Sequence, residues 1–77
     1  MTLFNYISDN IDTIKKEIRI GLISSSTLKH WQMYARYDYY KRIGNKTTNA
    51  LDFAAIDCGI KDRSWAWQIK KRMETEL

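Results

Sequence analysis

The feature that most constrains this 77-residue chain is its scarcity of residues that break helices. It contains no proline, and its three glycines stand at positions 21, 44 and 59. Both residue types disfavour helix interiors, so their rarity predicts long helices separated at three points. No Asn-Gly or Asp-Gly pair joins two alternating segments, so β-hairpins are not expected. The sequence therefore predicts an all-α fold.

Composition places the chain among small globular domains. Hydrophobic residues make up 44% of the chain and aromatic residues 13%, more than a disordered segment carries. A chain of this length makes one domain, with a core only just large enough to fold independently. We therefore expect a single helical domain over residues 1–77, built as a compact bundle of about four helices.

The first expected helix spans residues 3–23 and carries a single apolar stripe. Thr2 is its expected N-cap and Gly21 its end. The apolar side chains follow one another at intervals of three or four residues, which places them on one helix face: Phe4, Ile7, Ile11, Ile14, Ile18 and Leu22. We expect this stripe to cover the core. In the alternative interpretation, its heptad-like spacing pairs it with a second copy of the chain.

The second expected helix begins at a cap at Ser26 or Thr27, ends near residue 43 and is rich in aromatic rings. Its apolar residues fall on two opposite faces: Leu28, Trp31, Ala35 and Tyr39 on one, and Met33, Tyr37 and Tyr40 on the other. Two interpretations are open. Either both faces are buried, or Tyr37 or Tyr40 joins the neighbouring basic residues in contacting phosphates or a partner protein.

Residues 49–75 have the layout of two short helices around a turn. We expect Thr48 or Asn49 to cap the first helix and Asp62 to cap the second. Gly59 stands where the chain must turn sharply, and glycine adopts the positive φ of such a turn without steric cost. The residues expected to face inward are Ala54, Ala55, Cys58, Ile60, Trp65 and Ile69.

This stretch resembles the helix-turn-helix of bacterial and phage repressors and transposases. The resemblance rests on a small residue, a glycine and apolar residues at the offsets of the family: Ala55, Gly59, Ile60, Ser64 and Trp65. Trp65 departs from the pattern because it is bulkier than the usual valine or isoleucine. The resemblance implies a small transcriptional or mobile-element regulator that binds double-stranded DNA sequence-specifically, with the last helix in the major groove. It also implies a homodimer that binds paired half-sites.

Two groups of DNA-contacting residues follow from the resemblance. The first group faces the groove from the last helix and the residues just before it: Lys61, Asp62, Arg63, Ala66, Trp67, Lys70 and Lys71. Arginine near the start of such a helix suits bidentate contact with guanine, and lysine further along suits phosphates. The second group precedes a helix N-terminus, whose free N–H groups and dipole favour an anion: Lys46, Thr47 and Thr48.

Two of these side chains have alternative roles. Trp67 either packs on a thymine methyl group in the groove or is buried against the first motif helix or another subunit. Asp62 is suited to accept a hydrogen bond from cytosine, but we expect it to cap its own helix instead.

The distribution of charge agrees with a polyanionic partner. The net charge is +4, and residues 29–48 and 60–73 each contain five basic residues against one acidic residue. Such surfaces raise the local concentration of nucleic acid. They are also what an ordinary solvated helix carries, so charge alone favours DNA only weakly.

Other kinds of chemistry are not indicated. A single cysteine, Cys58, and a single histidine, His30, exclude an internal disulfide and an ordinary zinc site. We therefore expect neither an enzyme nor a metal or cofactor. No apolar run approaches the roughly 20 residues needed to cross a bilayer. No secretory signal is evident either, so we expect a cytoplasmic protein without a membrane partner.

The alternative function is a small protein-interaction domain. Such a domain would dock its partner through the aromatic second helix or the apolar first helix.

Overall fold

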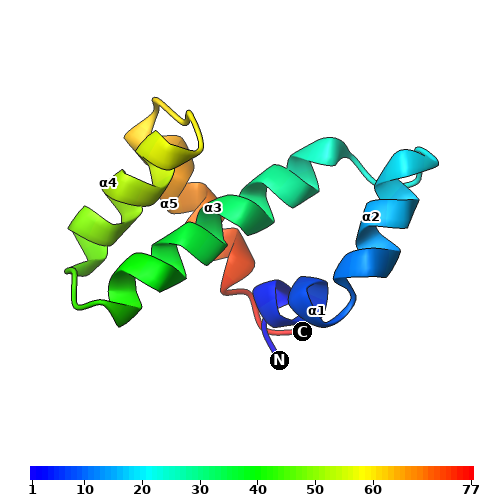
Figure 1. Cartoon of the computed structure of the whole chain (residues 1–77), viewed down its shortest axis with the longest axis horizontal. Coiled ribbons are helices and arrows are strands. Elements are labelled where there is room, and N and C mark those ends of the chain that lie inside the picture. The colour runs from blue at the N-terminus through cyan, green and yellow to red at the C-terminus, as the bar shows by residue number, and fades with distance from the viewer.

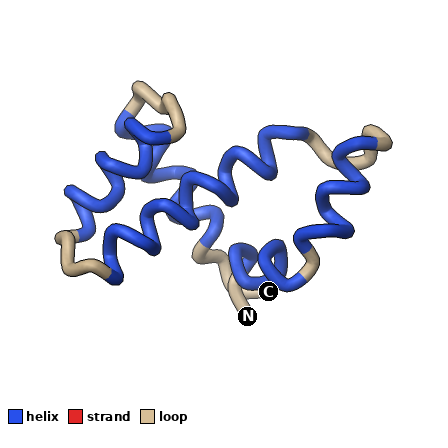
Figure 2. The backbone as a smooth tube through the Cα atoms, viewed as in Figure 1, coloured by secondary structure: helices blue, strands red, loops and turns tan.

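The structure, a computed structural model that describes all 77 residues, consists of five α-helices and no sheet (Figures 1 and 2). The helices are α1 (Leu3–Asp9), α2 (Ile11–Arg19), α3 (Ser25–Arg42), α4 (Thr47–Asp57) and α5 (Arg63–Met73). The predicted all-α class is confirmed, but the expected count of four helices is wrong. The molecule measures 36 × 26 × 18 Å, so its shortest dimension accommodates about two helix diameters.

The additional helix arises because the chain breaks at Asn10, inside the segment expected to form one helix. The Asn10 backbone lies at φ −120° and ψ 26°, outside the helical region. Its side-chain Nδ2 donates to the Tyr6 carbonyl oxygen at 2.8 Å, and its backbone amide donates to the same oxygen at 3.2 Å. Asparagine is favoured at helix ends because its short side chain bonds to nearby backbone groups, and the chain changes direction between α1 and α2.

Helix α3 is the central element, because it packs against each of the other four helices. In Figure 1, α1 and α2 lie beside its first half and α4 beside its second half, while α5 crosses behind it. The buried core joins all five helices: Ile7 from α1, Ile14 from α2, Met33 and Tyr37 from α3, Ala50, Leu51, Ala54 and Ala55 from α4, and Ala66, Ile69 and Met73 from α5. Alanine at so many of these positions allows the helix axes to approach closely.

The first two helices cover the core. Ile7 and Ile14 are buried, so the apolar stripe is used inside the chain and the core-covering interpretation is confirmed. Phe4 packs against Tyr34 with a centroid separation of 4.7 Å, and the Trp31 indole N–H donates to the Ser8 hydroxyl at 2.9 Å. These contacts fix α1 on α3, and little of the stripe remains for the alternative pairing with a second copy.

The two chain ends lie side by side (Figure 1). The Leu3 amide donates to the Thr75 carbonyl oxygen at 2.8 Å, and the Leu77 amide donates to the Met1 carbonyl oxygen at 2.9 Å. This short antiparallel pairing holds the start of α1 against the segment that follows α5.

All three glycines end helices, as the sequence predicts. Gly59 has φ +72°, its amide donates to the Ile56 carbonyl oxygen, and the Ile60 amide donates to the Ala55 carbonyl oxygen at 2.8 Å. This paired pattern is the Schellman motif, which satisfies carbonyl groups that the helix end leaves free. Helices α2 and α3 end with the same hydrogen-bond pattern around Gly21 and Gly44.

The helix starts agree less well with the sequence. The predicted caps Thr2 and Asp62 are confirmed, since each side chain accepts a backbone N–H of its own helix. Helix α3 is capped by Ser24 instead of Ser26 or Thr27. Helix α4 begins directly after Lys46, whose ammonium group cannot accept a hydrogen bond, so the expected caps Thr48 and Asn49 are wrong.

Two residues expected in the core are exposed. Cys58 is the C-cap of α4, beyond its last inward-facing turn, and its side chain is exposed. Trp65 is 44% exposed, because the buried row of α5 runs through Ala66, Ile69 and Met73. Of the two residues of this helix expected to face inward, Ile69 lies in the buried row and Trp65 does not. A tryptophan therefore flanks the core instead of filling it.

We expect Gly59→Val to lower the free energy of unfolding by about 1 to 3 kcal/mol, because a β-branched residue tolerates positive φ poorly. A Cβ at this position would meet no atom within 4 Å, so the cost comes from the backbone alone. Gly59→Asn is the matched control, since asparagine adopts this conformation more readily. Thermal unfolding measures both. Equal melting temperatures for the two variants would contradict the assigned turn.

Candidate nucleic-acid interface

The outward row of α5 is set by its buried row. Ala66, Ile69 and Met73 face the core, so residues about half a turn away must face solvent. Ser64, Gln68 and Lys71 occupy that opposite side and are exposed. Their spacing of three and four residues aligns them along the helix. We call these three residues the outer row of α5.

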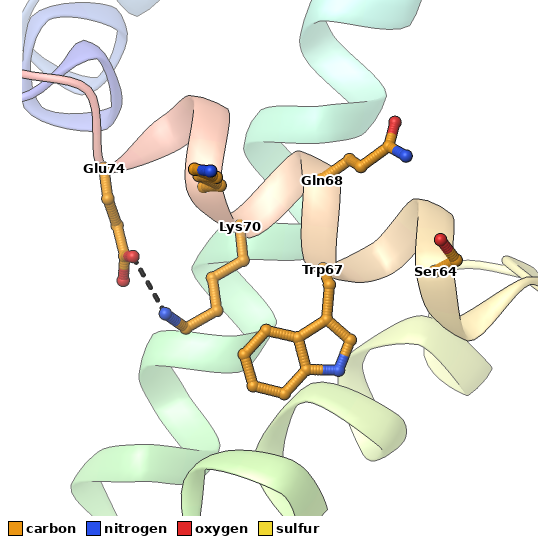
Figure 3. A pocket seen from close by; sticks show the side chains of 6 residues that line it. Ser64, Trp67, Gln68, Lys70 and Glu74 are labelled. Atoms are coloured by element: carbon orange, nitrogen blue, oxygen red, sulfur yellow. Dashed lines mark hydrogen bonds and ion pairs between the residues drawn. The ribbon is translucent and has the colours of Figure 1, made fainter.

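The outer row combines several hydrogen-bonding groups with one free cation. Ser64 carries a hydroxyl, Gln68 carries an amide with two donor hydrogens and an acceptor oxygen, and Lys71 has no acidic partner within 4.0 Å. They border a shallow hollow of about 370 Å³, together with Trp67, Lys70 and Glu74 (Figure 3). Glutamine in such a position suits adenine, and lysine suits phosphate.

Gln68 is a residue that the sequence-based prediction missed. The prediction took Trp65 for a core residue because it stands at an apolar offset of the helix-turn-helix pattern. The exposed side of the helix was therefore assigned to the wrong residues. The small and apolar residues at positions 66, 69 and 73 are spaced as one buried helix face. That spacing predicts that Gln68 lies on the opposite, exposed face.

The prediction that Ala66 faces the DNA groove is wrong. Its side chain is 1% exposed and belongs to the core cluster between α5 and its neighbours. A side chain that is buried in this way cannot contact a base. Its role is to allow close packing of α5.

Lys70 was expected to reach DNA, but its side chain is engaged within the chain and only 16% exposed. Its Nζ lies 2.8 Å from Glu74 Oε1 and 5.6 Å from the ring centroids of both Tyr37 and Trp67. Figure 3 shows Lys70 directed toward Glu74 and beside Trp67. Its charge is therefore compensated by a carboxylate and two aromatic faces.

Glu74 extends this arrangement to α3. Its Oε2 accepts a hydrogen bond from the Tyr34 hydroxyl at 2.9 Å. Burial raises the pKa of Tyr34 well above its usual value, and the hydrogen bond to Glu74 raises that pKa further. The carboxylate thus connects the last turn of α5 with the middle of α3, which fixes the orientation of the helix end.

Trp67 is neither in the core nor fully exposed. Its side chain is 39% exposed and leaves α5 on the side of Lys70, away from Gln68 (Figure 3). It therefore borders the outer row and is partly exposed to solvent. The interpretation that it is buried against the first motif helix is wrong.

Arg63 is exposed at the start of α5 but is already engaged by an acidic residue. Its Nε donates to Asp52 Oδ1 at 3.1 Å, and its Nη2 donates to Asp52 Oδ2. The Asp52 hydrogen bonds raise the pKa of Arg63. This carboxylate occupies the same donor edge that a guanine would use, so base contact by Arg63 requires release from Asp52.

The remaining predicted contacts lie near the start of α4 and in the turn before α5. Lys46 and Lys61 are exposed and have no acidic partner within 4.0 Å. The Thr47 hydroxyl accepts a hydrogen bond from Lys41 Nζ at 3.1 Å, which brings a second ammonium group to the first turn of α4. Thr48 is exposed on that turn. The basic character expected of this loop is therefore present.

The tyrosines proposed for a functional role in the second helix are both engaged internally. Tyr37 is buried, so it cannot contact phosphates or a partner. The Tyr40 hydroxyl donates to Asp57 Oδ2 at 2.7 Å, and Arg36 Nη2 donates to the same oxygen at 2.9 Å. These hydrogen bonds, that of Tyr40 first, lower the pKa of Asp57. Tyr39 is the exposed ring of this helix.

The structure brings no other reactive groups together. Burial raises the pKa of the Cys58 thiol, which disfavours the nucleophilic thiolate at neutral pH. No three side chains of His, Cys, Asp or Glu lie close enough to share a metal ion. None of the helices combines the length and the apolar character that crossing a bilayer requires.

We expect Lys70→Met to lower the free energy of unfolding by about 0.5 to 1.5 kcal/mol, because it removes an ion pair and contacts with two rings. Lys71→Met is the control on the exposed side of the same helix and should change stability by less than about 0.5 kcal/mol. Thermal unfolding distinguishes them. Equal stability of the two variants would show that Lys70 is not engaged as described.

Comparison of the chain with models of protein families, with curated proteins and with solved structures finds no match.

Proposed function

We propose that this protein binds double-stranded DNA sequence-specifically through α5, with the outer row in the major groove. The observation that carries the proposal is the combination of a glycine-ended α4, a tight turn and an α5 whose outward side presents Ser64, Gln68 and Lys71. An isolated α-helix fits the major groove, where its exposed polar side chains read base edges. A small transcriptional or mobile-element regulator is the corresponding biological role.

In this arrangement the residues divide into those that read bases and those that hold phosphates. Gln68 is the base-reading candidate, because its amide can pair with the N6 and N7 positions of adenine. Lys71, Lys61 and Lys46 are free ammonium groups that suit phosphates on either side of the groove. Lys70 is excluded from this role by its contacts with Glu74, Tyr37 and Trp67.

Phosphate contacts should be visible in the salt dependence of binding to random-sequence duplex DNA. We expect Lys71→Ala to reduce the slope of log K against log[salt] by about 0.9, the release of roughly one counterion. Lys15→Ala, on α2, removes the same charge away from α5 and should leave the slope unchanged. Fluorescence anisotropy at several salt concentrations measures both. Absence of binding at tens of micromolar protein in low salt would exclude the proposal.

Base reading requires a selected target sequence, obtained by enrichment from a random DNA pool. On that target, Gln68→Ala should cost about 1 to 3 kcal/mol of affinity and relax discrimination at one base pair. Affinity for random DNA should change little, because an amide contributes no charge. An equal loss on target and random DNA would contradict a base-reading role for Gln68.

A second candidate function, protein interaction, is favoured by a different surface. Tyr39, Phe53 and Ile56 are exposed on α3 and α4, and the Tyr40 ring lies 5.3 Å from both the Tyr39 and Phe53 ring centroids. Exposed aromatic and aliphatic side chains in one patch suit a protein partner. A second copy of the chain is the partner that would also supply a second DNA-reading helix.

Sedimentation over a concentration series tests self-association through this patch. We expect the wild-type chain to form dimers as concentration rises and Phe53→Ser to shift that equilibrium toward the monomer. Lys16→Ser, an exposed position on α2, is the control for a surface change elsewhere. A wild-type protein that stays monomeric with and without DNA would exclude the homodimer.

A further inference from the structure

A second concavity lies on the other flank of α5 from Trp67. It encloses about 460 Å³ between the first half of α3, the turn after α4 and the start of α5. Pockets that hold small molecules typically have volumes of about 300 to 1,000 Å³. Its contributing residues come from three separate parts of the chain, so the tertiary structure creates it.

Three apolar side chains line this cavity together with polar ones from α3, among them Ser26 and Gln32. Trp65 forms one side and is 44% exposed, although the sequence-based prediction placed it in the core. Ile60 and Cys58 line the side formed by the α4–α5 turn. A partly exposed indole ring offers a stacking surface for a planar ligand.

His30 supplies a directed donor beside that ring. It is the one buried polar residue of the chain, 8% exposed, and its ring lies edge-on to Trp65 with centroids 5.3 Å apart. Its Nδ1 lies 3.2 Å from Arg72 Nη1, and because arginine can only donate, Nδ1 must accept. The proton of the neutral ring is therefore on Nε2, which has no protein hydrogen-bond partner.

One cation and one carboxylate line the cavity. Lys29 lines it and has no acidic partner within 4.0 Å. Asp57 also lines it, but its Oδ2 already accepts hydrogen bonds from Arg36 and Tyr40. Burial and the neighbouring Arg72 lower the pKa of His30, so its ring is neutral at pH 7 and acts as a donor without adding charge.

From this combination we propose that the cavity binds a small planar aromatic carboxylate. The aromatic part stacks on Trp65 and contacts Ile60, while the carboxylate accepts a hydrogen bond from His30 Nε2–H and pairs with Lys29. His30 Nε2–H and the Lys29 ammonium group are both donors, so a purely apolar molecule would leave them unpaired. The proposal does not depend on DNA binding, because none of these residues belongs to the outer row of α5.

The position of the cavity gives ligand binding a structural consequence. Trp65 lies one residue from Ser64 of the outer row, and Ile60 completes the hydrogen-bonded turn that ends α4. A ligand that contacts both α3 and α5 stabilises their relative arrangement. Binding should therefore raise the melting temperature as ligand concentration increases.

The test uses 2-naphthoate as the probe and its neutral analogue 2-naphthylmethanol as the matched control. Titration into the ¹⁵N-labelled chain should shift the Trp65 indole N–H and the His30 amide resonances, with a dissociation constant of about 1 mM or lower for a probe of this size. The Trp67 indole N–H serves as an internal control and should not shift. We expect the alcohol to bind about three to ten times more weakly, because it lacks the charge-assisted contacts.

Two variants separate the contributions. Lys29→Met changes an exposed side chain and should lower the naphthoate-to-alcohol affinity ratio, because the carboxylate then keeps only its hydrogen bond from His30. Trp65→Ala should weaken both probes, whereas Trp67→Ala should weaken neither. The absence of Trp65 and His30 shifts at about 10 mM naphthoate would overturn the proposal. Equal affinity of the wild-type chain for both probes, or shifts confined to Trp67, would overturn it as well.

Discussion

The structure depends on the packing of one row of α3 against small residues of α4 and α5. Met33 and Tyr37 are buried together with Ala50, Ala54 and Ala66, and the other helices are arranged around this contact. Small side chains are required because the apolar area available to a chain of this size is limited, and close packing recovers dispersion contacts. A larger residue at Ala54 or Ala66 would separate the helices and move the outer row of α5.

The glycine turns at the helix ends determine how each following helix is oriented, and therefore which of its sides is buried. Each Schellman turn ends a helix within one residue and sends the chain back toward α3. At Gly59 this turn, followed by the Asp62 cap, sets where α5 begins and therefore which of its sides is buried. The candidate interface and the cavity at Trp65 are both consequences of that orientation, on two different flanks of one helix.

The electrostatic properties relevant to function come from the basic residues that the fold leaves free. Arg36, Arg63 and Lys70 each form an ion pair with a carboxylate of the same chain. Their charges are therefore compensated within the fold. Lys71, Lys61, Lys46 and Lys29 have no such partner. Net charge alone does not distinguish the paired from the unpaired basic residues, because the difference depends on whether the fold brings an acidic side chain next to each of them.

The sequence by itself determined the helical class, the three glycine ends, the caps at Thr2 and Asp62 and the core role of Ile7 and Ile14. These features depend on local backbone chemistry and on periodicity within one segment. Only the tertiary structure decided the burial of Ala66 and the exposure of Trp65 and Gln68. Whether a side chain is buried depends on which neighbour packs against it. The pairing of Arg63 with Asp52 joins two different helices, and so does the contact of Lys70 with Tyr37 beside its ion pair with Glu74. The periodicity of one helix cannot predict such contacts between helices.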